Sequence, residues 1–415
     1  MKPRVATPRP WEWLYDAVGL GMWAVTNARF DLQILGDAVP QVAAGQLWVV
    51  THRAETDVPV IGGLLMIRGG MVRRRPMSRV HFAARDDLFE PGVVSAGLHM
   101  PAVLARMAWP LSPGPWLPRV RAHPIRRPTG LKLGQALRGL DPTVALEDVI
   151  SSRLIGQLAR RATAIGRTPP GTVGQVRVAA FAEALWQDVS ADDLGGGVGR
   201  GVWRAHVART AGDVRRLIAL VRAGEPLVVF PEGRVSSDGD IGPVAAVLDV
   251  IARRGAPTAL LPVGIAYDPL RRGRTTVAIS VGPAIPASQG PVGPLVLARL
   301  RTATPVTVGQ IVARELVAAA ASDVTLQKRG LVEALKRAHE HACRDGRPVV
   351  RGLTSPGRRG RSLARALHML QSRGLVDEQA AGMLRIDPSA VLADPLIARL
   401  ATEDRAVWNT APGDP

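Results

Sequence analysis

Short apolar runs recur along the first three quarters of the chain, and turn residues separate them. Six runs are rich in β-branched residues and read as strands: QLWVVTH, RVHFAAR, PRVRAHPIR, PLVVFPEG, TALLPVGIAY and TTVAISVGPAI. Helical patterns lie between several of them, as in DVRRLIALVRAG ahead of EPLVVFPEG. Strands that alternate with helices predict an α/β fold over residues 30–290, with a mixed sheet flanked by helices.

Two regions depart from this alternation and read as helical. The first is an insert at about 130–210, where TVGQVRVAAFAEALWQDV opens with Thr172 and Gln175 at capping-box spacing. The glycine-rich stretch DDLGGGVGRGVW after it is expected to form a flexible joint. The second region is a C-terminal extension over 305–415, where TVGQIVARELVAAAA repeats the capping-box spacing.

The N-terminal segment 1–29 contains three tryptophans in WEWLYDAVGLGMWAV, and basic residues such as Lys2 and Arg9 precede them. The uncharged run Ala17 to Val25 is far shorter than the roughly 20 residues needed to cross a bilayer. We therefore expect a helix that lies in the membrane interface, in a chain that does not cross the membrane.

The charge balance points to an anionic partner. Lys and Arg outnumber Asp and Glu by 53 to 35, which gives a formal net charge of +18. Such a chain is suited to nucleic acid, an acidic membrane surface or phosphorylated substrates, although a GC-rich genome also enriches arginine. The single cysteine, Cys343, excludes an internal disulfide and fits a reducing compartment. HEHAC places only His339 and Cys343 on one helix face, so we expect no zinc site.

One polar pair directly follows the first of the strand-like runs. In VVTHRAETDVP, His52 comes after an apolar run and Asp57 follows five positions later. Two interpretations are open. Asp57 caps a helix that begins at VPVIGGLL. Alternatively, Asp57 orients the imidazole of His52, which then acts as a general base at the C-terminal end of a strand.

Further candidate residues lie where three other strands end. PLVVFPEG turns sharply at Pro-Glu-Gly, where Glu232 and Gly233 precede Arg234, whose guanidinium can clamp an anion. HFAAR ends in Arg85, and HPIRR ends in Arg127. The structural alternatives are an ordinary β-turn and solvated basic strand ends.

Taken in order, these residues resemble the glycerolipid acyltransferases, typified by 1-acylglycerol-3-phosphate (lysophosphatidate) acyltransferase. That family shows an H-x4-D block, an aromatic strand, an arginine-ended strand, an F-P-E-G block and an apolar P-V-G-I strand. This chain has His52 and Asp57, then HFAARDDL, HPIRR, FPEGR and LLPVGI in the same order. The resemblance covers residues 30–290 and leaves the insert and the extension uncovered.

Several positions depart from the family pattern. Thr51 stands where asparagine usually precedes the histidine, Ala54 replaces a common serine, and Arg85 replaces a lysine. Arg121 aligns with the glycine that usually opens the arginine-ended strand. After F-P-E-G the arginine comes one place early, at Arg234, so the family's phosphate clamp is matched only in part.

The resemblance implies an acyltransferase that moves a fatty acyl group from acyl-CoA or acyl-carrier protein to a hydroxyl of a lysophosphatidate-like acceptor in phospholipid synthesis. His52 would remove the hydroxyl proton, and Asp57 would stabilise the imidazolium. Transfer is direct in the family, so no metal is expected and no cofactor besides the acyl donor.

The resemblance also implies how the acceptor is held. Arg127 and Arg234, with backbone support from Gly233 and help from Arg85, would bind its phosphate. Glu232 would bind an acceptor hydroxyl or orient one of these arginines. The expected location is the cytoplasmic face of an anionic membrane, as a peripheral or monotopic protein, with no nucleic-acid partner.

Two other classes of protein remain open at this point. One is a catalytically silent lipid-binding relative, in which Thr51, Ala54 and the displaced arginine mark lost activity. The other is a basic nucleic-acid-binding protein, because LARALHMLQSRGLVDEQAAGML is similar to a winged-helix fragment.

Overall fold

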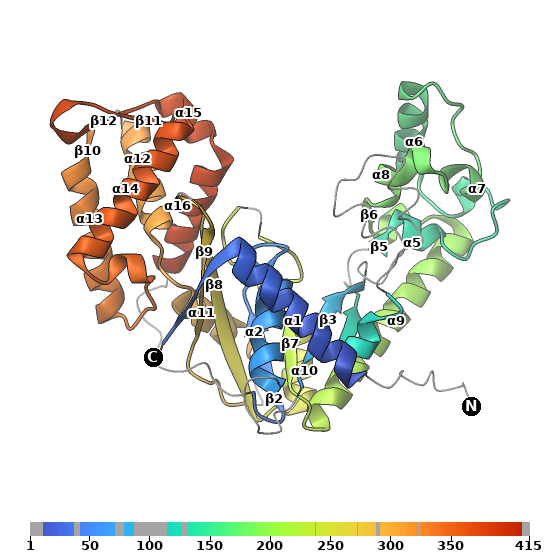
Figure 1. Ribbon diagram of the computed structural model, residues 1–415. Coiled ribbons are helices and arrows are strands. Elements are labelled where there is room, and N and C mark those ends of the chain that lie inside the picture. The colour runs from blue at the N-terminus through green and yellow to red at the C-terminus, as the bar shows by residue number, and fades with distance from the viewer. Residues whose placement is uncertain are drawn as a thin grey trace. The chain divides into compact units, whose positions relative to one another are not determined.

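The computed structural model divides the chain into two compact units. The first comprises Met1–Ala83, Gly114–His123 and Leu217–Pro415, and the second comprises Ala84–Pro113 and Pro124–Arg216. Figure 1 traces the chain from its N-terminus in blue to its C-terminus in red. The structure describes residues 11–36, 42–70, 79–86, 114–126, 131–236, 238–271, 273–287, 291–322 and 324–408.

A seven-stranded mixed sheet forms the α/β core (Figure 1). Its strands lie in the order β1-β9-β8-β2-β7-β3-β4, and only β8 and β9 are an antiparallel pair among the pairings described. The bounds are β1 Phe30–Leu35, β2 Gln46–Val50, β3 His81–Arg85, β4 Ala122–Ile125, β7 Leu227–Val229, β8 Ala259–Asp268 and β9 Thr275–Val281.

The predicted fold class is confirmed, because each of the six strand-like runs contributes one strand to this sheet. β1 was not expected, since its sequence FDLQIL carries two polar residues. β2 lies between β8 and β7 and pairs with both in parallel. Its residues Leu47 to Val50 are at most 1% exposed, as expected of an apolar strand covered on both faces.

Helices α1 (Glu12–Arg29), α2 (Asp57–Gly70), α10 (Val247–Gly255) and α11 (Gly293–Ala303) accompany the sheet. α1 packs along α2 (Figure 1). A Cβ atom at Gly63 would lie 2.8 Å from the backbone nitrogen of Trp23, so only glycine permits this close approach of the two helices.

α1 has two faces of different character. Tyr15, Gly19 and Thr26 are buried, whereas Trp13 and Trp23 are 66% and 42% exposed. No helix in the described part of the chain combines the length and apolar character needed to span a bilayer. The basic residues that precede the tryptophans lie outside the described residues.

The second unit has a hydrophobic core of its own. Its elements are β5 Leu131–Lys132, α5 Leu133–Leu137, α6 Ser152–Ala164, α7 Val173–Val176, α8 Ala182–Leu185, β6 Asp188–Val189 and the start of α9 Gly196–Arg222. The capping box predicted at Thr172 and Gln175 is present, but the helix that follows is only four residues long. β5 and β6 add a small antiparallel sheet that the helical interpretation of the insert lacked.

The expected flexible joint at GGGVGRG is wrong, because all of this stretch after Gly195 belongs to helix α9. A Cβ atom at Gly199 would lie 2.3 Å from the carbonyl oxygen of Val149. A Cβ atom at Gly196 would lie 2.4 Å from the carbonyl oxygen of Asp148. The glycines therefore serve close packing of a helix against a neighbouring segment.

The C-terminal extension is part of the first unit and is not helical throughout. Figure 1 shows its helices in orange and red. The elements are α12 Val308–Ser322, β10 Leu326–Gln327, α13 Lys328–Arg344, α14 Pro356–Ser372, β11 Val376–Glu378, β12 Met383–Ile386, α15 Pro388–Ala393 and α16 Pro395–Trp408.

The capping box at the start of α12 is confirmed, because Thr307 and Gln310 exchange hydrogen bonds of 2.9 and 3.2 Å. After α12 the order is strand, helix, helix and antiparallel hairpin, with β12 between β10 and β11. This is the succession of a winged helix, as the fragment resemblance suggested. Its apolar core includes Leu270 and Ala278, so it packs on the β8–β9 side of the sheet.

We predict that Gly199→Ala destabilises the second unit, because the added methyl would overlap the carbonyl of Val149. Overpacking of this kind costs about 1–3 kcal/mol. The matched control is Gly197→Ala on the same helix, where a Cβ atom meets nothing within 4 Å. Chemical denaturation followed by circular dichroism measures both variants. Equal unfolding free energies for the two variants would contradict this account.

Candidate active site

Two loops meet at the C-terminal ends of the neighbouring parallel strands β2 and β7. The loop after β2 carries His52, and the loop after β7 carries Phe230 and Glu232. The backbone N–H of His52 donates to Glu232 Oε1 at 2.8 Å, and the N–H of Ser236 donates to the carbonyl of His52 at 2.9 Å. The rings of His52 and Phe230 lie 4.7 Å apart. The two sequence motifs therefore form one site.

Asp57 is the first residue of α2, and its carboxylate is fully buried. Its Oδ2 lies 3.1 Å from Nδ1 of His52 and accepts the backbone N–H groups of Arg53 and Ala54 at 2.5 and 2.8 Å. Its Oδ1 accepts the hydroxyl of Tyr267 at 2.7 Å. These N–H groups precede Asp57 in the chain, whereas a helix N-cap accepts from residues that follow it. Asp57 therefore does not act as the N-cap of α2.

This geometry sets the tautomer of His52. A carboxylate can only accept, so Nδ1 carries the proton and Nε2 presents its lone pair. Among the described residues, Nε2 has no hydrogen-bond partner. The side chain of His52 is only 6% exposed. The arrangement is that of an oriented, largely desolvated base.

Glu232 supports the backbone of both loops. Its Oε1 accepts the N–H of His52, and its Oε2 accepts the N–H of Gly242 at 2.9 Å. Burial raises the pKa of Glu232, and the two N–H donors and the nearby Arg53 act in the opposite direction. The structure thus gives this carboxylate a role in holding the His52 loop, which sequence reasoning did not anticipate.

Gly233 and Arg234 form the outer part of the same corner. Gly233 has a φ of 67°, a left-handed conformation that favours glycine, and a Cβ atom there would meet nothing within 4 Å. Its N–H donates to the carbonyl of Phe230 in the turn. Arg234 is exposed and makes no ion pair with any described residue, so its guanidinium is available to an anion.

The remaining predicted arginines belong to the second unit. Arg85 is the last residue of β3 and is half-buried. Arg127 lies outside the described residues. Its neighbour Arg126 forms an ion pair with Asp213, in which Nη1 lies 2.6 Å from Oδ2. The part that Arg85 and Arg127 take in the site stays a prediction.

Arg121, which aligns with a family glycine, adopts the conformation that a glycine would favour. Its φ is 63° and its ψ is 22°, directly before β4. An arginine there carries the strain of a left-handed backbone. Its Nη1 donates to Nε2 of His81 at 3.0 Å and lies 3.3 Å from Glu225 Oε2. These contacts hold the guanidinium in place.

Tyr267 is a residue of the site that sequence reasoning missed. Its hydroxyl donates to Asp57 and lies 3.0 Å from the hydroxyl of Thr56. It ends the apolar run GIAY in β8, and tyrosine occurs only twice in the chain. A rare polar aromatic at the end of a strand was the available signal.

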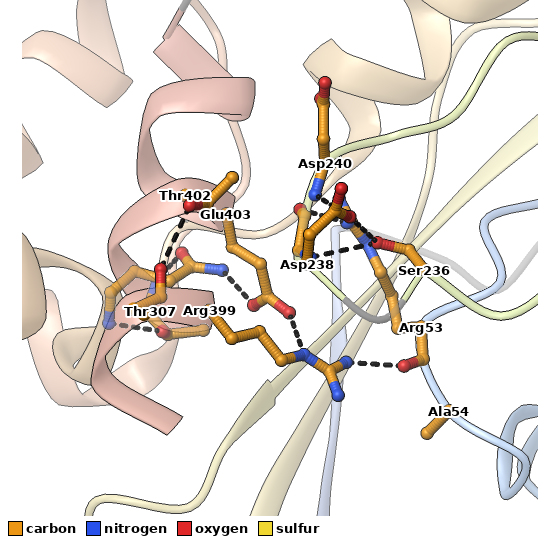
Figure 2. Close-up of polar contacts among 12 residues, drawn as sticks. Arg53, Ala54, Ser236, Asp238, Asp240, Thr307, Arg399, Thr402 and Glu403 are labelled. Carbon is orange, nitrogen blue, oxygen red and sulfur yellow. Dashed lines mark hydrogen bonds and ion pairs between the residues drawn. The ribbon is translucent and has the colours of Figure 1, made fainter. Parts of the chain in front are cut away.

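A second missed contact comes from the C-terminal extension. Figure 2 shows Arg399, on α16, reaching the carbonyl oxygen of Arg53 beside His52. Glu403 holds the Nε of Arg399 at 3.1 Å and accepts the side-chain amide of Gln310 at 3.3 Å. The guanidinium of Arg53 in turn donates to the carbonyl of Gly239. The sequence around these residues does not predict the contacts.

A cavity of about 570 Å³ adjoins this loop. Ala54, Thr56 and Tyr267 line it from the site, and Phe30 and Leu400 are among its apolar lining residues. Its charged lining residues are Arg29, Arg274, Arg399 and Glu403, of which the last two pair with each other. An apolar wall beside arginines suits an amphiphile with an anionic group.

A histidine pair links β3 and β4 near the edge of the sheet. Nδ1 of His81 lies 2.7 Å from Nε2 of His123. Because Arg121 donates to Nε2 of His81, Nδ1 of His81 carries the proton. Burial, helped by the charge of Arg121 and the neighbouring imidazole, lowers the pKa of His81 to about 3. His81 is therefore neutral at pH 7.

Comparisons with known proteins add little to this description of the site. No protein-family model and no curated protein matches this chain. Among solved structures, the crystal structure of the 1-acyl-sn-glycerophosphate (LPA) acyltransferase, PlsC, from Thermotoga maritima is similar over 70% of this chain and 77% of its own. The two sequences are 14% identical and the TM-score is 0.34. At these values, conclusions about function rest on the site itself.

We predict that His81 makes the folded state sensitive to acid. Its folded-state pKa lies below the unfolded value near 6.5, so the unfolded chain binds the extra proton between these values. The free energy of unfolding then falls as the pH drops below about 6.5, by up to about 1.4 kcal/mol per pH unit from this group. His81→Gln removes that contribution. Denaturant titrations from pH 7 to pH 4 measure the slope.

The control for this prediction is His368→Gln, because His368 is exposed on α14. It should leave the slope of the wild-type chain unchanged. A wild-type slope that persists in His81→Gln would refute the assignment.

Proposed function

We propose that this chain is an acyltransferase that moves a fatty acyl group from a thioester donor, acyl-CoA or acyl-carrier protein, to a hydroxyl of a phosphate-bearing, lysophosphatidate-like lipid. One observation carries the proposal. An imidazole oriented by a buried carboxylate lies at the C-terminal end of a parallel strand, beside a corner that presents a guanidinium. The order of the motifs along the chain agrees with it.

The chemistry needs one base. Nε2 of His52 removes the proton from the acceptor hydroxyl as that oxygen attacks the thioester carbonyl. The carbon–sulfur bond then breaks, and the imidazolium returns the proton to the departing sulfur. Asp57 stabilises the imidazolium, and Tyr267 holds the second oxygen of that carboxylate. The chain's residues perform every proton transfer of this direct reaction.

The acceptor phosphate is assigned to Arg234, whose guanidinium has no carboxylate partner among the described residues. Arg85 and Arg127 are proposed to complete its binding. Glu232 keeps the two loops together, so its role is positioning. Gly233 leaves open space beside the turn, where a side chain would obstruct the acceptor.

The amphipathic cavity beside the loop supports a lipidic or thioester ligand. Its apolar lining suits an acyl chain, and its arginines suit an anionic group. The formal charge of +18 favours acidic acyl-carrier protein, coenzyme A and anionic lipid as partners. The winged-helix order of elements after α12 leaves the His52 site unexplained, so we do not propose nucleic acid as the main ligand.

The exposed face of α1 supports a place on the membrane surface. Trp13, Leu20 and Trp23 share one side of the helix and are each at least 42% exposed. Arg119 lies 4.1 Å from the ring of Trp11 and 4.9 Å from that of Trp116. Tryptophans beside arginine are typical of the lipid–water interface. The proposed location is the cytoplasmic face, as a peripheral or monotopic protein.

We predict that purified protein transfers acyl groups to lysophospholipids and that His52→Ala lowers kcat by roughly a hundredfold or more, because the hydroxyl loses its base. Asp57→Asn should also lower kcat, since an amide can stabilise the wrong tautomer of His52. A panel of acyl-CoA and acyl-carrier-protein donors with several acceptors, analysed by mass spectrometry of the products, measures both effects.

The control for the kinetic test is His368→Ala, an exposed histidine on α14. Full activity of His52→Ala would remove this residue from the role of base. A wild-type chain that binds lysolipid and produces no acylated product would instead identify a catalytically silent lipid-binding relative.

We predict that the double variant Trp13→Ser/Trp23→Ser binds anionic vesicles at least tenfold more weakly. Each tryptophan should bury apolar area in the interface that serine cannot replace, and a tenfold loss corresponds to about 1.4 kcal/mol. Vesicle co-sedimentation measures the effect. Val324→Ser/Leu392→Ser is the matched control, because those residues are 59% and 51% exposed outside α1. Equal losses in both double variants would contradict an interfacial α1.

A further inference from the structure

A separate cavity of about 250 Å³ lies where α14 faces strands β1, β8 and β9. Its lining is dominated by arginine: Arg271, Arg351, Arg358, Arg361 and Arg365. It shares no lining residue with the His52 site or with the amphipathic cavity beside it. The proposed acyl transfer makes no use of it.

The two carboxylates of this cavity are already engaged. Asp31 Oδ2 lies 2.5 Å from Nη1 of Arg271. The buried Asp268 accepts the N–H of Gly309 at 3.0 Å, at the start of α12, and the N–H of Leu270 at 3.2 Å. The five arginines of the lining outnumber these two carboxylates, which leaves an excess of three positive charges in the cavity.

The other four arginines have no carboxylate partner among the described residues. Arg358 makes its described contact with the neutral hydroxyl of Thr354, at 3.1 Å. Arg358, Arg361 and Arg365 follow each other at i, i+3 and i+7, so one face of α14 presents three positive charges. An anion that lies among these three exposed guanidinium groups would relieve their mutual repulsion.

The walls of the cavity are held in place by hydrogen bonds. Gln33 Oε1 on β1 accepts the backbone N–H of Arg351 at 3.0 Å. Nη1 of Arg271 donates to Thr276 at 2.5 Å as well as to Asp31. The Nε of Arg271 is buried and has no hydrogen-bond partner among the described residues.

We propose that this arginine pocket binds a compact polyanion that carries two or more phosphate groups. Guanidinium groups pair with phosphate oxygens through two parallel hydrogen bonds. Four arginines without a carboxylate partner offer more donors than a ligand with a single carboxylate could use. The volume lies below the roughly 300–1,000 Å³ of typical drug-sized ligand pockets, which favours a small ligand.

The sheet edge distinguishes this pocket from a nucleic-acid surface. A winged helix reads a duplex with the exposed face of the helix that corresponds to α14. Here Asp31, Gln33 and Thr276 of the sheet line the same cavity as the arginines of that helix. A small anion that contacts both walls fits these residues better than the groove of a duplex does.

The arginine pocket and the candidate active site use adjacent residues of β8. Tyr267 holds Asp57, and the next residue, Asp268, lines the pocket and caps α12. Successive side chains of a strand point to opposite faces. The pocket is thus a second site in the same unit, and its binding test requires no acyl transfer.

The test is isothermal titration calorimetry of the full chain at fixed ionic strength, with inorganic phosphate, pyrophosphate and ATP as probes. We expect saturable one-to-one binding of pyrophosphate or ATP, tighter than that of phosphate. Arg361→Ala/Arg365→Ala should weaken it at least tenfold. The charge-matched control Arg329→Ala/Arg337→Ala removes two exposed arginines of α13, outside the pocket, and should bind as the wild type does.

A second arm separates a soluble ligand from a lipid headgroup. Co-sedimentation with phosphatidylcholine vesicles, with and without phosphatidylinositol phosphates, is measured in the presence of pyrophosphate. Loss of vesicle binding in Arg361→Ala/Arg365→Ala, together with competition by pyrophosphate, assigns the phosphates to a headgroup. Unchanged vesicle binding alongside lost pyrophosphate binding assigns them to a soluble metabolite.

Three results would overturn the proposal. The first is the absence of pyrophosphate and ATP binding to the wild-type chain together with vesicle binding that does not depend on Arg361 and Arg365. The second is an equal loss of binding in both double variants, which would indicate general charge. The third is arginine-dependent binding of a duplex oligonucleotide that pyrophosphate does not displace.

Discussion

The carboxylate of Asp57 is the constraint on which the site depends. A buried charge is tolerated only when its oxygens are satisfied, and here the ring of His52, two backbone N–H groups and the hydroxyl of Tyr267 meet that need. The same contacts fix the loop between β2 and α2 and the orientation of the imidazole. The contacts that stabilise the buried Asp57 carboxylate therefore also orient His52 as a base.

Around that centre, contacts from distant parts of the chain hold the loop. Glu232 joins it to the loop after β7, and Arg399 ties the carbonyl of Arg53 to α16. The glycerolipid acyltransferase resemblance ends near residue 290, yet the C-terminal extension contacts the loop beside His52. The extension is thus part of the structure that positions the proposed base, and its winged-helix succession of elements does not make it a separate module.

The arginine excess has at least two distinct structural settings. Some guanidinium groups form hydrogen bonds within the fold, as Arg121 does with His81 and Glu225. Others, such as Arg234 at the Pro-Glu-Gly corner and Arg361 in the arginine pocket, have no carboxylate partner among the described residues. Net charge alone does not separate these groups, because pairing depends on which acidic side chains the fold brings near.

The sequence by itself determined six of the seven strands of the core, two capping boxes and the candidate pair His52 and Asp57, because these depend on residues close together in the chain. Only the tertiary structure decided the roles of Tyr267 and Arg399, which act on the loop across 210 and 346 positions. It also showed that the glycine-rich stretch is helical, since only the packed neighbour reveals why a side chain is excluded. Local spacing specifies elements, whereas contacts between distant residues arise only when those elements pack.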